Sequence, residues 1–164
     1  MRFRNVAVTV VLLFVTSALM AQSEAQKSFD KLKTLVGTWE GKGAQGQTVR
    51  VTFRLTGNDS ALMSEIGAPE NMVTMFHMDG DRLLMTHYCG AGNQPRMKAL
   101  ASPDGKSIPF EFLDATGLTK SQPGHMKGLV VTVGDADHHT EAWTFETADG
   151  KPDMHEAFEL QRVK

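Results

Sequence analysis

The stretch from Met85 to Met97, MTHYCGAGNQPRM, gathers side chains that can do chemistry within a few residues. His87 and Cys89 flank Tyr88. Cys89 is the only cysteine of the chain, and Tyr88 is its only tyrosine. A cationic neighbour such as a protonated imidazole lowers the pKa of a thiol, which would make Cys89 a nucleophile or a redox centre. The alternative is a small apolar cysteine in a strand that runs into a glycine-rich turn.

Three histidines are candidates for a metal site, because the strand order described below places them at one end of the fold. His87, His125 and His155 would together suit zinc or copper. They do not follow a ligand spacing such as i, i+2 on one strand, and they could equally be unrelated polar residues at strand ends. Phe158 fits the inner face of its strand better, which turns His155 outward. We therefore assign no resident metal or cofactor, and zinc or haem remains the alternative.

A second group of polar residues surrounds a turn near the C-terminal end of the chain. Its members are Asp135, Asp137, His138, His139 and Glu141. They offer oxygen and nitrogen ligands to a cation, but their spacing matches no calcium-binding loop. A solvated acidic turn between two strands explains them as well. The ten methionines also leave two interpretations open, ordinary core filling or the adaptable wall of a ligand cavity.

The first 21 residues have the pattern of a secretory signal peptide. Arg2 and Arg4 precede the apolar run Val6–Val15, and small residues follow it up to Ala21. We expect cleavage after Ala21, with Ala25 as the alternative site. The alternative interpretation of this segment is a membrane anchor that is not cleaved. This predicts a periplasmic or secreted protein of one domain, residues 22–164, with no stable membrane insertion after cleavage.

Charge and cysteine content limit the partners of that domain. Cleavage after Ala21 removes two arginines, which leaves 15 basic residues against 19 acidic ones and moves the net charge from −2 to −4. A mildly acidic chain without a basic stripe argues against nucleic acid and anionic membranes as partners. With one cysteine there is no intramolecular disulfide, so the core must supply the stability. The sequence does not indicate the oligomeric state.

The remaining sequence predicts one helix followed by many short strands. Apolar residues at helical spacing favour a helix over Glu24–Val36, ended by Gly37. Alternating patterns and turn pairs such as Asp79-Gly80 then predict antiparallel strands. These are expected at Thr38–Gly43, Thr48–Thr56, Ala61–Gly67, Met72–Met78, Arg82–Cys89, Arg96–Ala101, Ile108–Asp114, Met126–Val133, His138–Glu146 and Met154–Val163.

About ten consecutive antiparallel strands can close into an up-and-down barrel or split into a sandwich. Closure removes the exposed strand edges, so we expect an all-β barrel of about ten strands with the short helix plugging one end. In this order Trp39 and Arg162 share the closed end with the helix. His87, His125 and His155 lie at the open end, whereas the other three histidines lie at the closed end.

The segment Leu35–Gly41, LVGTWEG, resembles the Gly-x-Trp signature that opens the first strand of calycins, such as lipocalins and fatty-acid-binding proteins. The resemblance implies that a basic residue of the last strand, here Arg162, packs over Trp39, with a cation–π gain of about 1 kcal/mol. In the related nitrobindin-like proteins a haem-ligating histidine lies near the C-terminus. His155 has that position here, but the local motif does not match well.

The chain also resembles the small secreted lipocalin-like proteins of the DUF1579 type, whose function is uncharacterised. Gly37–Trp39, Thr86–Cys89, Gly92–Pro95, Asp137–His139 and Trp143 carry the likeness, which spans nearly all of the domain. It implies a fold and a habit of binding small apolar molecules rather than a particular activity.

These observations favour an exported barrel that holds a small apolar or amphipathic ligand in its cavity. If Asp79-Gly80 forms a two-residue turn, the inner face of the two flanking strands carries His87 and Cys89, and Tyr88 points outward. The expected ligand-binding residues are Met72, Phe76, Met85, His87, Cys89, His125 and Trp143. A haem or metal protein that uses the open-end histidines is the second hypothesis. An enzyme with His87 as base or Cys89 as nucleophile is the third, although no catalytic set compels it.

Overall fold

A computed structural model describes residues 22–43, 46–69, 71–147 and 152–164. The expected signal peptide, residues 1–21, and the side chain of Met154 lie outside the described residues. One helix and ten strands are present in this part of the chain, and no helix in it is long and apolar enough to cross a membrane. They are α1 (Glu24–Lys33), β1 (Gly37–Lys42), β2 (Thr48–Thr56), β3 (Ala61–Ile66), β4 (Met72–Asp79), β5 (Arg82–Tyr88), β6 (Gln94–Ala99), β7 (Ser107–Thr116), β8 (His125–Val133), β9 (His138–Glu146) and β10 (Pro152–Arg162).

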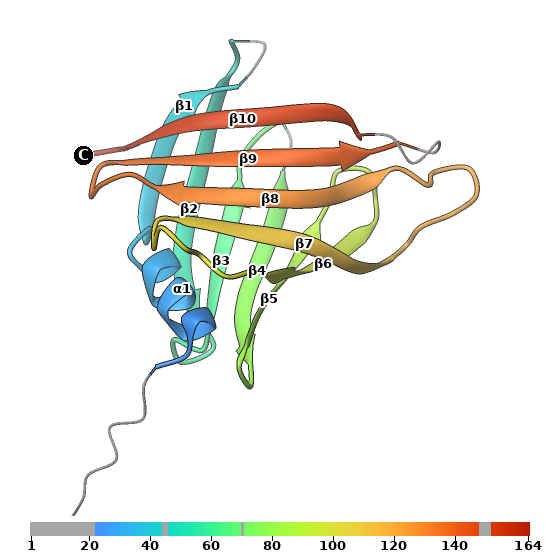
Figure 1. Ribbon diagram of the computed structural model, residues 1–164. Helices are drawn as coiled ribbons and strands as arrows, with labels where there is room; N and C mark the ends of the chain where they lie inside the picture. Colours follow the sequence, from blue (N-terminus) through green and yellow to red (C-terminus); the bar gives the residue numbers. More distant parts are fainter. Residues whose placement is uncertain (1–21, 44–45, 70, 148–151) are drawn as a thin grey trace, which may run out of the picture.

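The ten strands form a closed barrel in which each strand pairs with its neighbours in the sequence, and β1 pairs with β10 (Figure 1). Every pairing is antiparallel, so the topology is up-and-down. The pairing of β1 with β10 leaves no unpaired edge, which is the physical advantage of a barrel over a sandwich. The fold predicted from the sequence is therefore confirmed.

Several element boundaries differ from those expected. α1 ends at Lys33 rather than Val36, because the chain turns at Thr34 and Leu35, and the carbonyls of Leu35 and Val36 then accept from side chains of the barrel. β6 begins at Gln94 and β7 extends to Thr116, so the long connection that follows starts at residue 117. Asp79 pairs with Arg82, which makes the two turn residues Gly80 and Asp81 rather than Asp79 and Gly80.

The closed end is built around Trp39, which is fully buried beneath Arg162. The guanidinium carbon of Arg162 lies 4.1 Å from the centre of the indole ring, as the resemblance to calycins implied. Its nitrogens also donate to the carbonyls of Thr34 and Val36. A Cβ at Gly37 would lie 2.6 Å from Nη1 of Arg162, and the φ of +133° there suits glycine. This close approach explains the glycine two residues before the tryptophan.

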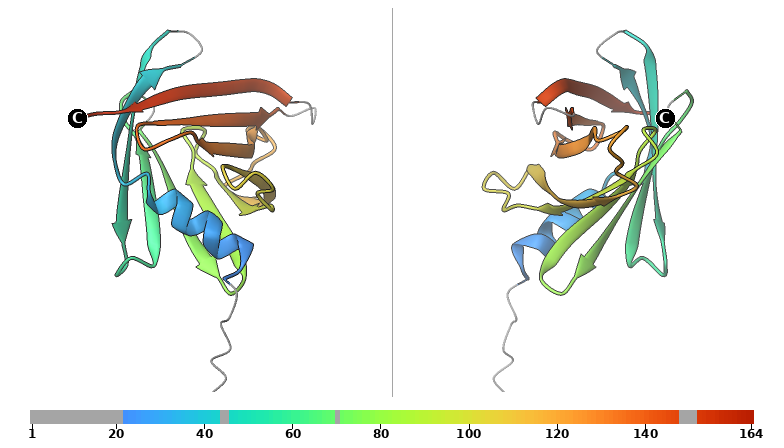
Figure 2. Two further views of the ribbon diagram at one scale, coloured as in Figure 1. Left: turned by 60° about the vertical axis from the view of Figure 1, so that its left-hand side comes forward. Right: turned by 90° about the vertical axis from the view of Figure 1, so that its right-hand side faces the viewer.

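α1 packs against the barrel beside β4 and β5 (Figure 2). Ser23 caps its first turn by accepting from the backbone N–H of Gln26. Phe29 and Leu32 are buried in the same core cluster as the inner residues of the strands. The helix thus supplies apolar side chains to the closed end, whereas the open end consists of connections between strands.

The inner face of β5 is the one expected from the turn between β4 and β5. Leu83, Met85 and His87 are buried, and Tyr88 is 51% exposed on the outer face. Across from β5, β4 contributes Thr74 and Phe76 to the interior. This alternation places His87 inside the barrel near the end of its strand, where the open end begins.

Candidate functional site

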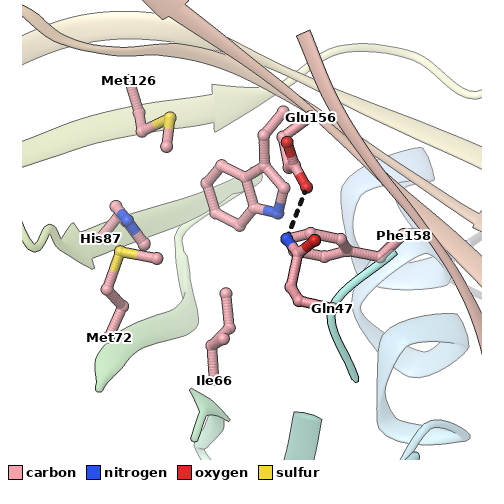
Figure 3. Close-up of a pocket in the computed structure, with 8 residues that line it drawn as sticks. Gln47, Ile66, Met72, His87, Met126, Glu156 and Phe158 are labelled. Carbon is pink, nitrogen blue, oxygen red and sulfur yellow. Dashed lines mark hydrogen bonds between the residues drawn. The ribbon is translucent and has the colours of Figure 1, made fainter. Parts of the chain in front are cut away.

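A cavity of about 180 Å³ lies inside the barrel toward the open end (Figure 3). It is formed where β3, β4, β5, β8, β9 and β10 bring inward-pointing residues together, with one residue added by the connection between β1 and β2. The lining residues are Gln47, Ile66, Met72, His87, Met126, Trp143, Glu156 and Phe158. Most of these side chains are apolar, and the polar ones are Gln47, His87 and Glu156.

His87 is the buried polar residue of the wall. Thr74 lies directly opposite on β4, and its hydroxyl shares a hydrogen bond of 2.9 Å with Nδ1 of His87. The imidazole also packs against Trp143, with ring centres 4.6 Å apart. These two contacts fix the position of the ring and leave Nε2 without a hydrogen-bond partner in the described structure.

Burial sets the charge of this histidine. The side chain is fully buried, and desolvation lowers the pKa of His87 from 6.5 to about 4. The ring is therefore neutral at physiological pH. A neutral imidazole carries its proton on one of the two ring nitrogens. If the proton is on Nδ1, Nε2 accepts a hydrogen bond; if it is on Nε2, that nitrogen donates one.

The apolar part of the wall comes from residues with different shapes. Met72 on β4 and Met126 on β8 have flexible thioether side chains that lie near His87 (Figure 3). Trp143 on β9 and Phe158 on β10 provide rigid ring surfaces, and Ile66 on β3 completes this side. Such a wall can adapt to an occupant at the methionines while the rings keep its overall shape.

Two polar residues lie at the cavity on the side away from His87. Nε2 of Gln47 donates to Oε1 of Glu156 over 3.4 Å, as the dashed line in Figure 3 marks. Gln47 precedes β2, and Glu156 is part of β10. Because β1 lies between β2 and β10 in the barrel, this hydrogen bond connects the segments on either side of β1. The contact gives the cavity a polar rim in addition to its apolar wall.

The residues expected to bind a ligand occupy different places in this geometry. Met72, His87 and Trp143 line the cavity. Phe76 and Met85 are buried elsewhere in the core, with Phe76 packed against Phe110 at 5.5 Å between ring centres.

Cys89 and His125 have surroundings of their own. Cys89 is half-buried and packs against the core without lining the cavity. His125 is buried at the start of β8, where its ring packs on Phe112 at 4.4 Å and Nδ1 lies 3.1 Å from the carbonyl oxygen of Pro123. Only part of the expected set therefore meets at one cavity, and the ligand-binding role of each residue stays a prediction.

The three open-end histidines do not share one site. His87 is inside the barrel, His125 packs on Phe112, and His155 is exposed with Nδ1 3.4 Å from the hydroxyl of Thr144. The outward direction expected for His155 agrees with its exposure. Within the described ranges no three His, Cys, Asp or Glu residues come close enough to hold one metal ion.

The acidic turn before β9 separates into two unlike halves. Asp135 and His138 interact at the surface, where the backbone N–H of Asp137 and then His138 hold the pKa of Asp135 below its usual range. His139 and Glu141 instead point into the barrel and are buried. The interpretation of all five as one cation site or one solvated turn is therefore wrong, because the strand alternation of β9 divides them.

Glu141 is a buried carboxylate that sequence reasoning did not place in the interior. Oε2 accepts from the indole N–H of Trp143 over 3.1 Å, and Oε1 lies 3.5 Å from Nε2 of His139. Glu141 thereby holds the indole that forms part of the cavity wall. The period of two could have revealed it, because an inward Trp143 requires an inward Glu141 and an inward His139.

Other cavity residues were also absent from the expected set. Ile66 and Phe158 follow from strand alternation, and Met126 precedes a β-bulge of β8, where the regular alternation is interrupted. Gln47 lies in a connection without a periodic pattern. No sequence signal indicates that it meets Glu156, which is 109 residues away along the chain.

Comparison with known proteins supports the architecture and goes no further. No protein-family model matches the chain, and no curated protein matches it. The crystal structure of Rv2717c from M. tuberculosis is similar, with a TM-score of 0.55 and 16% sequence identity over 84% of this chain and 98% of that one. A redesigned β-barrel matches with a TM-score of 0.33 and 13% identity over 88% of this chain and 98% of its own. At this level of identity the likeness to Rv2717c shows the fold alone, which is compatible with a calycin-like barrel.

Proposed function

We propose that this chain is an exported binding protein that holds a small apolar or amphipathic molecule in the open-end cavity. One observation carries the proposal. His87 lines an apolar cavity, and its buried Nε2 has no hydrogen-bond partner in the described structure. A buried polar group without a partner costs about 1–3 kcal/mol. An occupant with one polar group that pairs with Nε2 recovers this free energy.

The chemistry of the wall favours an occupant that is mainly apolar. Ligand sites of this kind combine apolar and aromatic walls with a few polar groups that fix the orientation. Here Trp143, Phe158 and the two methionines supply the apolar contact, and His87 supplies the orienting group. Because the imidazole is neutral, it pairs with a hydroxyl, carbonyl or amide and gives no charge attraction to an anion.

The volume limits the size of the enclosed part. Drug-sized ligands occupy pockets of about 300–1,000 Å³, whereas an engineered protein cavity of about 150 Å³ holds benzene. The cavity here is about 180 Å³. We therefore expect the buried part of the ligand to be the size of a single ring or a short chain. A longer tail would leave the barrel past Gln47 and Glu156.

The proposal also includes export of the protein and its membership of a family of secreted lipocalin-like proteins. The signal-peptide pattern of residues 1–21 supports a periplasmic or secreted location. The motifs that resemble the DUF1579-type proteins support a place among those secreted lipocalin-like chains.

The experiment is native mass spectrometry of the protein purified from the periplasm of its own host, followed by denaturation and identification of the released molecule. We expect a one-to-one complex with an organic molecule that carries a single polar group. The variant His87→Phe should lose most of the occupant, because the ring remains but the pairing nitrogen is gone.

The matched control is His155→Ala. His155 lies at the same end of the barrel but is exposed, so its removal should leave the occupancy unchanged. A barrel that emerges empty from its native compartment, or an occupant that both variants retain equally, would contradict the proposal.

A further inference from the structure

We propose that the same cavity binds one Cu(I) ion through Nε2 of His87 and the thioether sulfurs of Met72 and Met126, with the face of Trp143 against the ion. This inference rests on the proposed function only in using the cavity as a binding site. It does not require an organic ligand. Met72 and Met126 are neutral, and His87 binds as the neutral ring, so the ion keeps its single positive charge and no proton is released.

The first support is the way in which His87 is held. A histidine that ligates a metal usually donates its other ring N–H to an oxygen, which fixes the tautomer and the direction of the ring. Thr74 offers such an oxygen to Nδ1 at 2.9 Å. In the tautomer with the proton on Nδ1, Nε2 presents a lone pair, and it has no partner in the described structure.

The second support is the position of the two sulfurs. In Figure 3 the side chains of Met126 and Met72 lie on either side of His87, at the same wall of the cavity. Met72 comes from the strand that pairs with β5, and Met126 comes from β8 across the barrel. Methionine has three rotatable bonds, so rotation about them can direct both sulfurs toward an ion near Nε2.

The third support is the match between these ligands and one class of ion. Thioethers are soft ligands that select Cu(I), whereas zinc, magnesium and calcium prefer imidazole sets or oxygen. Among the residues that line the cavity, the carboxylate is Glu156, which bonds to Gln47 on the side away from His87. A hard divalent cation would therefore meet sulfur and hydrocarbon where it needs oxygen.

The fourth support is the indole of Trp143, which packs against the imidazole at 4.6 Å between ring centres. A cation within about 6 Å of the face of an aromatic ring is attracted by its quadrupole, and tryptophan gives the strongest attraction. Glu141 accepts from the indole N–H and so restrains the ring. A monovalent ion beside His87 thus gains a neutral aromatic cover and needs no anionic ligand.

The test is anaerobic titration of the metal-free protein with Cu(I), in competition with a chromophoric Cu(I) chelator. The free thiol of Cys89 binds the same ion, so every variant carries Cys89→Ser, and the unmodified chain is titrated alongside. We expect one tightly bound ion per chain and partial quenching of the tryptophan fluorescence, because Trp143 is one of the two tryptophans of the chain. Thr74→Val should weaken binding roughly 10–100-fold, because it removes the oxygen that orients His87.

The decisive variant is Met72→Leu with Met126→Leu, which removes both sulfurs and keeps a similar apolar volume. It should weaken Cu(I) binding by more than Thr74→Val does. Met97→Leu is the matched control, because Met97 is a fully buried methionine that does not line the cavity. Thermal unfolding monitored by circular dichroism confirms that each variant folds.

The outcomes separate this inference from the proposed function. If the sulfur-free variant binds Cu(I) as tightly as its parent, or if the parent binds none, the copper site is overturned. Binding of an organic molecule to the same preparation would then leave the proposed function standing. Copper binding that depends on both sulfurs, in a protein whose native form carries no organic molecule, supports the inference and overturns the proposed function.

Discussion

The two ends of the barrel each bury a histidine against a tryptophan, but they surround it differently. At the closed end His139 lies edge-on to Trp39, with ring centres 4.3 Å apart, and Phe53 lies 5.6 Å away on another side. Its Nε2 is 3.5 Å from Glu141. Nδ1 has no partner in the described structure, but the neighbouring rings fill the space around the imidazole.

At the open end His87 has a tryptophan on one side and a cavity on another. Its Nδ1 is fixed by Thr74, its Nε2 has no partner in the described structure, and the residue lines a space of about 180 Å³. Filled surroundings give stability, because every ring has neighbours at contact distance. A cavity beside a fixed polar atom instead allows a ligand to bind, but the unfilled space lowers the stability of the fold. We therefore expect substitutions at the closed end to unfold the barrel and substitutions at the open end to empty it.

The largest effect is expected for Glu141→Ala, because its carboxylate contacts both the closed-end His139 and the indole of Trp143. The change removes the acceptor of the Trp143 indole N–H and the neighbour of His139. Removal of one member of a buried polar or charged pair costs about 3–5 kcal/mol. We expect a loss of that size in the free energy of unfolding, measured by urea denaturation.

Glu141→Gln is the control for this change, because it keeps a carbonyl oxygen for the indole and should lose less than half as much. If Glu141→Ala lost under about 1 kcal/mol, the closed end would not be the part of the barrel that stability depends on.

The pH dependence of stability should reveal the buried neutral His87. Desolvation lowers the pKa of His87 to about 4 in the folded state, compared with 6.5 in an unfolded chain. The unfolded state therefore binds more protons between these values, and stability falls as the pH falls from 6.5 through 4. Above pH 6.5 the contribution is fully present, and below pH 4 about 3 kcal/mol is lost.

The measurement compares the urea stability of the wild type and of Thr74→Val with His87→Phe at pH 7 and at pH 4. Other groups titrate in this range, so only the difference between the two proteins reports on His87. Equal losses in both would show that His87 is not held neutral by its surroundings.

Arg162→Ala should have an intermediate effect at the closed end. The guanidinium covers Trp39 and donates to the carbonyls of Thr34, Val36 and Ala136. A cation–π contact of about 1 kcal/mol and partly exposed charged hydrogen bonds suggest a loss of about 2 kcal/mol. Thermal and urea unfolding both measure it.

Arg162→Lys tests the origin of that loss. Lysine keeps the charge over the indole but cannot donate to three carbonyls from one planar group. A lysine variant as stable as the wild type would show that the carbonyl contacts contribute little.

Much of the closed end and of the barrel was predictable from the sequence, because period and turn chemistry act locally. The alternation of Thr48–Thr56 gave β2 with its observed bounds. The turn after β4 fixed the inward direction of His87, although the turn residues are shifted by one position. The contact of Trp39 with Arg162 came from the resemblance to calycins rather than from any local pattern.

The rest depended on contacts that no local pattern encodes. Glu141 was grouped with the polar residues of the preceding turn, as a cation ligand or a solvated residue, yet it is buried with Trp143 and His139 as its partners. The cavity itself depends on which side chains fail to fill the interior. That property arises from the packing of six strands, so Gln47 and Met126 could not be assigned to it in advance.

The smallest effect on stability, and of opposite sign, is expected for Thr74→Val combined with His87→Phe at the open end. The pair replaces a hydroxyl and an imidazole with apolar groups of similar shape, so the unpartnered nitrogen disappears together with its one hydrogen bond. Replacing both members of a buried polar pair is neutral or stabilising, and here we expect a gain of about 1 kcal/mol.

The same double variant should lose the occupant of the cavity, because the orienting nitrogen is gone. Native mass spectrometry and urea denaturation on one preparation measure both properties. A gain in stability with a loss of binding is the trade expected where a fold keeps a costly polar atom for its function. A loss of several kcal/mol, comparable to that of Glu141→Ala, would instead make His87 part of the structural core. The two ends of the barrel would then differ in their cavities but not in what their histidines do.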